Sequence, residues 1–275
     1  MMAVLLAGGG VLRSWPLIGD VPTALLPLGH STPLDLILQK IEATQLFDQV
    51  LITIHPHWKD EFRRWALEND YESIEIVVEP STAKGNFNAV KALNLATRGI
   101  HDDCLVMPCD NVFSSSLTPI VSFFKTIRSP VVALRRAQNL EETRGYSNID
   151  ANDVGRVTEI IEGPLGRKSN VVQTDISLIP AKTLPRVHEY VSEGLGDGTL
   201  SGFTEWLSTI EPIHGYFLDG HWFDIVTPES YLEALGRTVG HSSIIVWQCS
   251  VFGKWTKTKS TMRSKSLSAR ASQFT

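Results

Sequence analysis

The sequence predicts a doubly wound α/β fold with a mixed, mostly parallel sheet, and three observations support this prediction. Short apolar runs alternate with segments of helical periodicity through the first half of the chain. The first apolar run ends in three consecutive glycines, Gly8, Gly9 and Gly10. A later apolar run leads directly to Asp110. Because ligands of such folds bind at the carboxyl ends of the strands, we expect the functional residues at one edge of the sheet.

Size, charge and cysteine content exclude several classes of protein. The chain has 275 residues, 43% of them hydrophobic, which is enough for a full core. A formal net charge of −5 argues against a general nucleic-acid-binding protein. Cys104, Cys109 and Cys249 fit neither a disulfide framework nor a zinc site. Two of them, Cys104 and Cys109, lie in or beside an apparent buried strand, so we interpret these two as small core residues. The N-terminal apolar run is too short for a signal peptide or a membrane span, which favours a cytoplasmic protein.

The first half of the chain gives the parallel part of the expected sheet. The apolar runs predict strands at residues 4–7, 50–54, 74–78, 104–107 and 131–134. The intervening segments predict helices at residues 33–43, 58–68 and 117–127, and a further helix that begins at Gly85.

The second half predicts antiparallel strands. Residues 146–150 and 156–161 flank a turn signal and predict a hairpin, and residues 171–179 predict a long strand. Helices are expected at residues 184–191 and 203–210, with a mobile, glycine-rich loop at 194–202 between them. A second hairpin is expected from residues 213–218 and 221–224, followed by a helix that Thr227 caps and Pro228 opens.

Composition divides the chain into three parts. Residues 1–240 are expected to form a single domain, and residues 241–253 a C-terminal strand. Residues 254–275 contain six Lys or Arg, nine Ser or Thr and no acid, which predicts a disordered basic tail. A contact of this tail with RNA, an anionic membrane or the acidic body of the protein is the alternative interpretation.

The glycine segment predicts a loop that binds phosphate. Glycines let backbone N–H groups approach an anion closely, and Arg13 adds a planar cationic group nearby. The pattern matches neither GxGxxG nor the P-loop, so a tight strand exit without a ligand is the alternative.

Asp110 and Asp224 are the candidate metal ligands. Each follows a strand-like run, and two carboxylates together with substrate phosphates are the usual environment of Mg²⁺. Such a metal beside Arg13 and the glycine amides would make a phosphoryl-transfer site. For either aspartate alone, a helix cap or a turn is an equally good explanation.

Four segments in order resemble the sugar-1-phosphate nucleotidylyltransferases, also called nucleoside-diphosphate-sugar pyrophosphorylases. They are AGGGVLRSWPL from Ala7, VMPCDNVF from Val106, VTEIIEGP from Val157 and GHWFDIVTPESYLEAL from Gly220. The resemblance extends from about Val4 to Leu235. It implies a Rossmann-like nucleotidyltransferase fold with a small, β-rich sugar-binding part.

The resemblance also implies roles for individual residues. Arg13, Asp110 and Asp224 would be catalytic, the two aspartates as ligands of Mg²⁺. Ala7, Gly8, Gly9, Gly10, Glu79 and Gly85 would bind the nucleotide. Glu162, Tyr146 and Thr174 would bind the acceptor substrate.

Several positions depart from the family pattern. Val11 and Leu12 replace a glycine and a threonine of the first motif, and Thr23 stands where the family has a phosphate-binding lysine. The other replacements are Asn86 for Thr, Gly163 for Lys, and Ser147 and Asp175 for Gly. Lys84 or Lys168 could supply one missing charge. These departures indicate an altered substrate or a lost activity.

We therefore expect a nucleotidylyltransferase that transfers NMP from an NTP to a sugar-1-phosphate or related phosphate and releases pyrophosphate. A non-catalytic homologue that binds a nucleotide or sugar phosphate and regulates or scaffolds a partner is the alternative. An unrelated Rossmann-like cofactor-binding protein is disfavoured, because no acidic residue ends a clear second strand to bind a ribose. The partners expected are the small-molecule substrates, with a homo-oligomer as a further possibility.

Overall fold

The computed structural model describes residues 1–8, 21–71, 74–79, 87–139, 141–143, 145–152, 155–161 and 169–239. The chain divides into two units, Met1–Ser242 and Ser243–Thr275. The second unit lies outside the described residues, as do the predicted strand at 241–253 and Cys249. Among the described residues, no helix has both the length and the apolar character needed to span a membrane.

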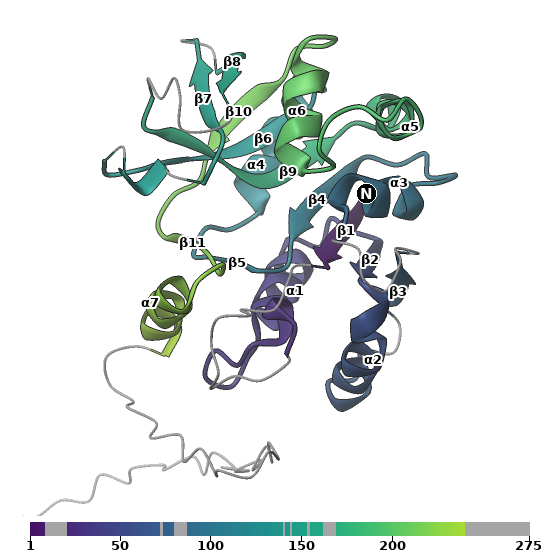
Figure 1. Cartoon of the computed structure of the whole chain (residues 1–275), viewed down its shortest axis with the longest axis vertical. Helices are drawn as coiled ribbons and strands as arrows, with labels where there is room; N and C mark the ends of the chain where they lie inside the picture. The colour runs from purple at the N-terminus through teal and green to yellow at the C-terminus, as the bar shows by residue number, and fades with distance from the viewer. Residues whose placement is uncertain are drawn as a thin grey trace, which may run out of the picture. The chain divides into compact units, whose positions relative to one another are not determined.

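Strands and helices follow the predicted α/β order (Figure 1). The strands are β1 Met2–Ala7, β2 Gln49–Ile54, β3 Glu75–Val78, β4 Cys104–Pro108, β5 Asn111–Phe113, β6 Val131–Arg136, β7 Asn148–Ala151, β8 Val157–Ile161, β9 Val171–Ile179, β10 His214–Phe217 and β11 Trp222–Asp224. The α-helices are α1 Pro33–Thr44, α2 Lys59–Glu68, α3 Ala89–Ala96, α4 Thr118–Ile127, α5 Leu184–Ser192, α6 Leu200–Ser208 and α7 Pro228–Val239. Short 3-10 helices are η1 Thr23–Leu25, η2 Pro56–Trp58, η3 Glu141–Thr143 and η4 Ala181–Thr183.

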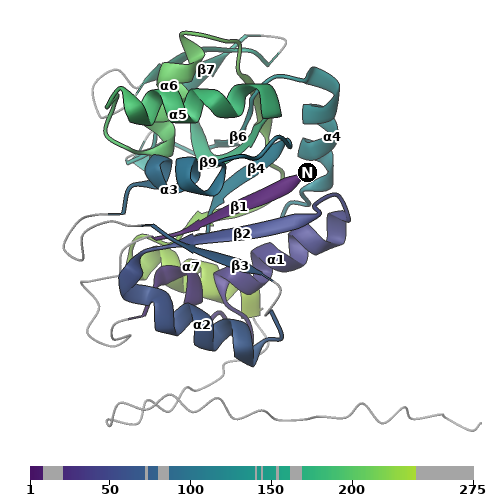
Figure 2. The same cartoon turned by 90° about the vertical axis from the view of Figure 1, so that its right-hand side faces the viewer.

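The main sheet is mixed and mostly parallel, as the sequence predicts. Its principal order is β10-β6-β9-β4-β1-β2-β3, and the hairpin β7-β8 joins it through β9. Figure 2 shows the succession from β6 through β9, β4, β1 and β2 to β3. The strands β4, β1, β2 and β3 pair in parallel, whereas β9 runs antiparallel to both β4 and β6. The carboxyl ends of β1 to β4 therefore lie at one edge of the sheet.

Apolar layers cover both faces of this sheet. One core cluster unites β-strand side chains with buried residues of α1, α2 and α4, and the other unites them with α3, α5 and α6. The strand β1 is buried along its whole length, which explains its continuous apolar sequence. Cys104 and Cys109 are buried free thiols, in agreement with their interpretation as core residues.

Three predictions about elements need correction. The expected second hairpin is wrong, because β10 pairs in parallel with β6 and β11 pairs antiparallel with β5 in a separate two-stranded sheet. The glycine-rich loop ends earlier than predicted, since the Thr199 hydroxyl accepts a hydrogen bond from the Gly202 N–H and α6 begins at Leu200. The helix predicted from Gly85 begins at Ala89, where the Asn88 side chain caps it.

Candidate active site

The residues that end the parallel strands lie at one edge of the main sheet. Ala7 is the last residue of β1 and Gly8 follows it, Glu79 follows β3, and Asp110 follows β4 after one intervening residue. This edge is where open α/β sheets bind their ligands. The placement of these residues agrees with the sequence prediction.

A two-stranded sheet brings Asp224 to Asp110. In the antiparallel pairing of β11 with β5, Asp224 lies opposite Asn111, the residue after Asp110. The Ile225 N–H also donates a hydrogen bond of 3.0 Å to the carbonyl oxygen of Asp110. Figure 1 shows β5 and β11 side by side next to α7. The two aspartates are thus neighbours although they lie far apart in the sequence.

The environment of both carboxyl groups disfavours their negative charge. Burial raises the pKa of Asp110. Burial also raises the pKa of Asp224 to about 8, and the negative charges of Asp110 and Asp175 contribute to this rise. The Tyr146 hydroxyl donates a hydrogen bond to the Asp224 carboxylate, which acts in the opposite direction. Two buried, mutually repelling carboxylates are suited to bind a hard cation.

A chain of hydrogen bonds holds Asp110 in place. The Asn111 side-chain amide donates to Asp110 Oδ1 over 3.2 Å. The buried Trp222 indole N–H donates in turn to Asn111 Oδ1 over 2.8 Å. The indole therefore fixes the orientation of the amide, and the amide fixes that of the carboxylate. Asn111 and Trp222 both stand in the quoted motifs, yet the sequence alone did not reveal this contact.

Aromatic and cationic groups surround the carboxylate pair. The Tyr146 ring packs edge-on against Trp222 with 5.4 Å between centroids. The Arg135 guanidinium lies 5.7 Å from the centroid of the Trp222 ring and forms a 2.8 Å ion pair with Glu142. Arg135 is a cation beside this site that the sequence reasoning missed, because it is one of two adjacent arginines at the end of an otherwise apolar strand.

The predicted acceptor residues have different environments. Tyr146 contacts the carboxylate pair as described. Burial and the negative charge of Asp224 both raise the pKa of its phenol. Thr174 is buried, and its hydroxyl donates a 3.1 Å hydrogen bond to the carbonyl oxygen of Ala133. Glu162 lies outside the described residues.

The predicted nucleotide side is described only in part. Phe87 lies against Gly8 so closely that a Cβ at this glycine would collide with the phenyl ring. Glu79 is buried, and its Oε2 has no hydrogen-bond partner in the described part of the chain. Such an orphaned acceptor fits contact with a ligand. Gly9, Gly10, Arg13 and Gly85 lie outside the described residues.

Thr23, which stands where the resemblance expects a lysine, is buried in η1.

In the described ranges, no cluster of three or more His, Cys, Asp or Glu side chains could hold a metal ion. Asp110 and Asp224 could hold a metal at this edge, with substrate oxygens or water completing its coordination.

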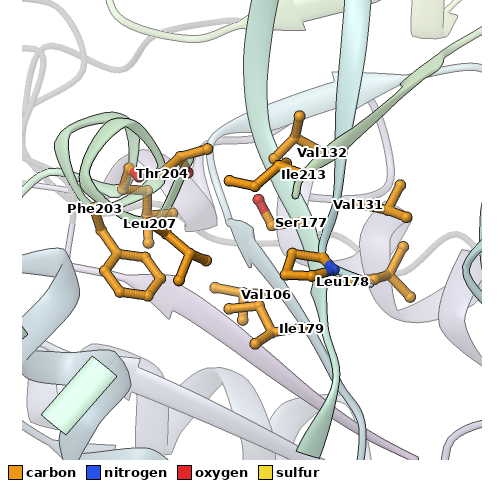
Figure 3. Close-up of a pocket in the computed structure, with 12 residues that line it drawn as sticks. Val106, Val131, Val132, Ser177, Leu178, Ile179, Phe203, Thr204, Leu207 and Ile213 are labelled. Atoms are coloured by element: carbon orange, nitrogen blue, oxygen red, sulfur yellow. Dashed lines mark hydrogen bonds between the residues drawn. The ribbon is translucent and has the colours of Figure 1, made fainter. Parts of the chain in front are cut away.

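A cavity elsewhere in the fold is part of the apolar core. It lies between α6 and strands β4, β6 and β9, and Ser177 and Thr204 are the polar residues in its lining (Figure 3). A ligand site of this fold would need convergent polar groups, which this cavity lacks.

Two curated relatives are similar to this chain over most of its length. The chain is 25% identical over 247 residues to the UTP–glucose-1-phosphate uridylyltransferase AglF of Haloferax volcanii, covering 86% of this chain and 96% of AglF. It is 24% identical over 236 residues to the bifunctional protein GlmU of Methanococcus aeolicus, covering 85% of this chain but only 53% of GlmU. The chain thus spans about half the length of GlmU.

The fold is also that of solved nucleotidyltransferase structures. A putative glucose-1-phosphate thymidylyltransferase from Bacillus anthracis superposes with a TM-score of 0.72 at 20% identity, covering 92% of this chain and 98% of that one. A UDP-glucose pyrophosphorylase in complex with UDP-glucose gives a TM-score of 0.70 at 16% identity, covering 86% and 98%. The family model described as nucleotidyl transferase matches residues 2–239, and the chain belongs to this family.

Proposed function

We propose that this protein is a magnesium-dependent enzyme that transfers NMP from an NTP to a sugar-1-phosphate or a related phosphate ester. The observation that carries the proposal is the buried pair Asp110 and Asp224 at the carboxyl edge of the sheet. Membership of the nucleotidyl transferase family supports the reaction class. The relative AglF, whose name specifies UTP and glucose 1-phosphate, supports the substrate class.

The reaction is a displacement at phosphorus. An oxygen of the acceptor phosphate forms a bond to the α-phosphorus of the NTP, the bond between this phosphorus and the β-phosphate oxygen breaks, and pyrophosphate leaves. The bound Mg²⁺ would neutralise phosphate charge during this exchange. Asp110 and Asp224 would hold it, and the amides of the glycine segment with Arg13 would stabilise charge on the leaving group. No covalent enzyme intermediate is required.

The residues around the pair would maintain its geometry. The hydrogen bonds from Trp222 to Asn111 and from Asn111 to Asp110 fix one carboxylate, and the Tyr146 hydroxyl holds the other. Since the pKa of Asp224 is raised to about 8 in the metal-free protein, metal binding near neutral pH would release a proton.

Pyrophosphate release tests the proposal. The protein is incubated with Mg²⁺, each NTP and a panel of sugar phosphates. We expect turnover with at least one pair of substrates. Asp110→Asn should lower the turnover rate by about 10²–10³-fold, which is the typical effect of removing one preorganised group that stabilises a transition state. Asp219→Asn, an exposed carboxylate near the same two-stranded sheet, is the matched control and should keep full activity. Nucleotide binding without turnover on any acceptor would instead support a non-catalytic homologue.

A further inference from the structure

A buried amide beside the candidate active site has no hydrogen-bond partner among the described residues. Asn148, the first residue of β7, is 2% exposed. Among the residues that the structure describes, neither its Oδ1 nor its Nδ2 has a partner. Buried side-chain amides are nearly always hydrogen-bonded, and leaving both groups unpaired is costly. This side chain therefore calls for an explanation.

The sheet register shows which face Asn148 occupies. Asn148 lies opposite Val172 in the pairing of β7 with β9, and Val172 lies opposite Arg135 in the pairing of β9 with β6. Residues directly opposite one another in a sheet project from the same face. Asn148 therefore lies on the face where Arg135 approaches Trp222, the residue two positions before Asp224. Its nearest neighbour in this row, Val172, offers no polar side-chain atom.

We infer that Asn148 is a specificity-determining residue, whose side-chain amide hydrogen-bonds a hydroxyl of the acceptor. An amide offers a carbonyl acceptor and an N–H donor, and a hydroxyl both donates and accepts, so the two groups are complementary. A hydroxyl-rich phosphate ester would satisfy both orphaned atoms at once. This inference rests on the proposed function, since it identifies the side of the site that binds the acceptor.

A neighbouring carboxylate specifies the charge of the acceptor. Asp175 lies in β9 with φ of +59°, at the irregularity in the pairing of this strand with β6. Gln173 Nε2 donates to Asp175 Oδ1 over 3.1 Å and to Thr204 Oγ1 over 3.2 Å, which holds the carboxylate in one orientation. Asp175 lies in the same strand as Val172, which stands opposite Asn148. The part of the acceptor beside Asp175 is therefore neutral and not a second anion.

The test compares Asn148→Leu with Asn69→Leu. Leucine is similar in size to asparagine but makes no hydrogen bond. Asn69 lies at the end of α2, and its amide donates a 2.7 Å hydrogen bond to the carbonyl oxygen of Trp65, so it serves as a structural control. Each variant is measured for the KM of glucose 1-phosphate, the KM of the NTP, the thermal midpoint of the free protein, and the rise of this midpoint with glucose 1-phosphate.

We expect Asn148→Leu to raise the KM of glucose 1-phosphate about tenfold, the equivalent of one neutral hydrogen bond, and to leave the KM of the NTP unchanged. Its free protein should melt no lower than the wild type, because an unpaired polar group has been removed. Asn69→Leu should lower the midpoint without changing either KM. Wild type should also prefer glucose 1-phosphate to glucuronic acid 1-phosphate, and Asp175→Asn should reduce this preference.

Other outcomes separate this inference from the proposed function. If wild type turns over but Asn148→Leu has an unchanged KM and a lowered midpoint, Asn148 is structural and the inference is overturned alone. If wild type releases no pyrophosphate, but glucose 1-phosphate stabilises it and not Asn148→Leu, the proposed function fails and the inference stands. If glucose 1-phosphate neither reacts nor stabilises the wild type, both are overturned. Should the leucine variant not fold, Asn148→Thr is measured in the same way.

Discussion

The two halves of the main sheet differ in regularity. The strands β1 to β4 pair in parallel without a shift of register, and most of their side chains pack in the apolar core. The pairings β6 with β9 and β7 with β8 both contain a shift. Asp175 adopts a left-handed conformation inside a strand, whereas Gln45 and Arg128 adopt it at helix ends. The regular half presents a common edge, and the irregular half carries Asn148 in β7 and Asp175 in β9.

The comparison suggests that the two halves of the sheet bind different substrates. The edge of the regular half holds Gly8, Glu79 and Asp110, which we assign to the nucleotide and the metal. The irregular half holds Asn148 and Asp175, which we assign to the acceptor. If this division is right, changes at the carboxylate pair should affect catalysis with every acceptor, and changes in the irregular half should affect the choice among acceptors.

The largest expected effect is on the pH dependence of stability, through the carboxyl group of Asp224. Its ordinary pKa is 3.8, and the folded, metal-free protein raises it to about 8. The folded protein thus keeps a proton that the unfolded chain releases, so this group's contribution to stability falls as pH rises from about 4 to about 8. We expect the thermal midpoint in EDTA to decrease across this window in wild type, and to decrease less in Asp224→Asn. Stabilisation by Mg²⁺ should increase over the same window, because binding requires the deprotonated form.

Asp219→Asn is the control for this titration and should keep the slope of the wild type. Equal slopes for wild type and Asp224→Asn would mean that Asp224 is ionised throughout, and that the carboxylate pair is less buried than the structure shows.

A smaller effect, on stability and turnover, is expected from a substitution of Trp222. Replacing it with Phe keeps an aromatic ring but removes the N–H that donates to Asn111 Oδ1. A buried acceptor left unpaired destabilises a protein by about 1–3 kcal/mol. Urea unfolding of Trp222→Phe should show this loss, and turnover should fall with all acceptors because Asn111 no longer fixes Asp110. Trp206→Phe is the control, since the Trp206 indole packs against Tyr190 and Phe203. An equal loss in both variants would reduce the role of Trp222 to packing.

The smallest expected effect is a difference in stability between two substitutions of Asp175. Gly and Ala both remove the carboxylate and its bond with Gln173, but only Ala retains a Cβ at φ of +59°. A left-handed conformation disfavours a residue with a Cβ by roughly 1–2 kcal/mol relative to glycine. Asp175→Gly should therefore be more stable than Asp175→Ala by about 1 kcal/mol in urea unfolding. Equal stabilities would indicate that the strand relaxes to an ordinary conformation at this residue.

The sequence predicts the regular half better than the irregular half, for physical reasons. The runs that form β1, β2 and β4 are buried on both faces, so their composition identifies them. The turn at Gly220 was recognisable, and its φ is +76°. A turn does not determine the partners of its flanking segments, however, so the pairing of β11 with the short strand β5 was missed. Long-range pairing had to come from the structure.

The same distinction applies to the site. Asp110 and Asp224 were predicted because each follows an apolar run within a recognisable motif. Asn148 carries no such signal, because an asparagine near a predicted turn is ordinary, and its isolation becomes visible only when the neighbouring strands are in place. The structure shows that Asp110 and Asp224 are neighbours, but their roles remain predictions. The roles of Arg13 and Glu162 remain predictions too, and both residues lie outside the described ranges.

The pairing of β5 with β11 has a consequence for folding. The hydrogen bond between Trp222 and Asn111 joins residues that are 111 positions apart. Closing so long a segment costs chain entropy before any contact is gained, and distant pairings of this kind are slow to form. We expect the strands β1 to β4 to associate before β11 arrives. A nascent chain would thus have much of its sheet before the two carboxylates meet, and the carboxylate pair forms only after synthesis has passed Asp224.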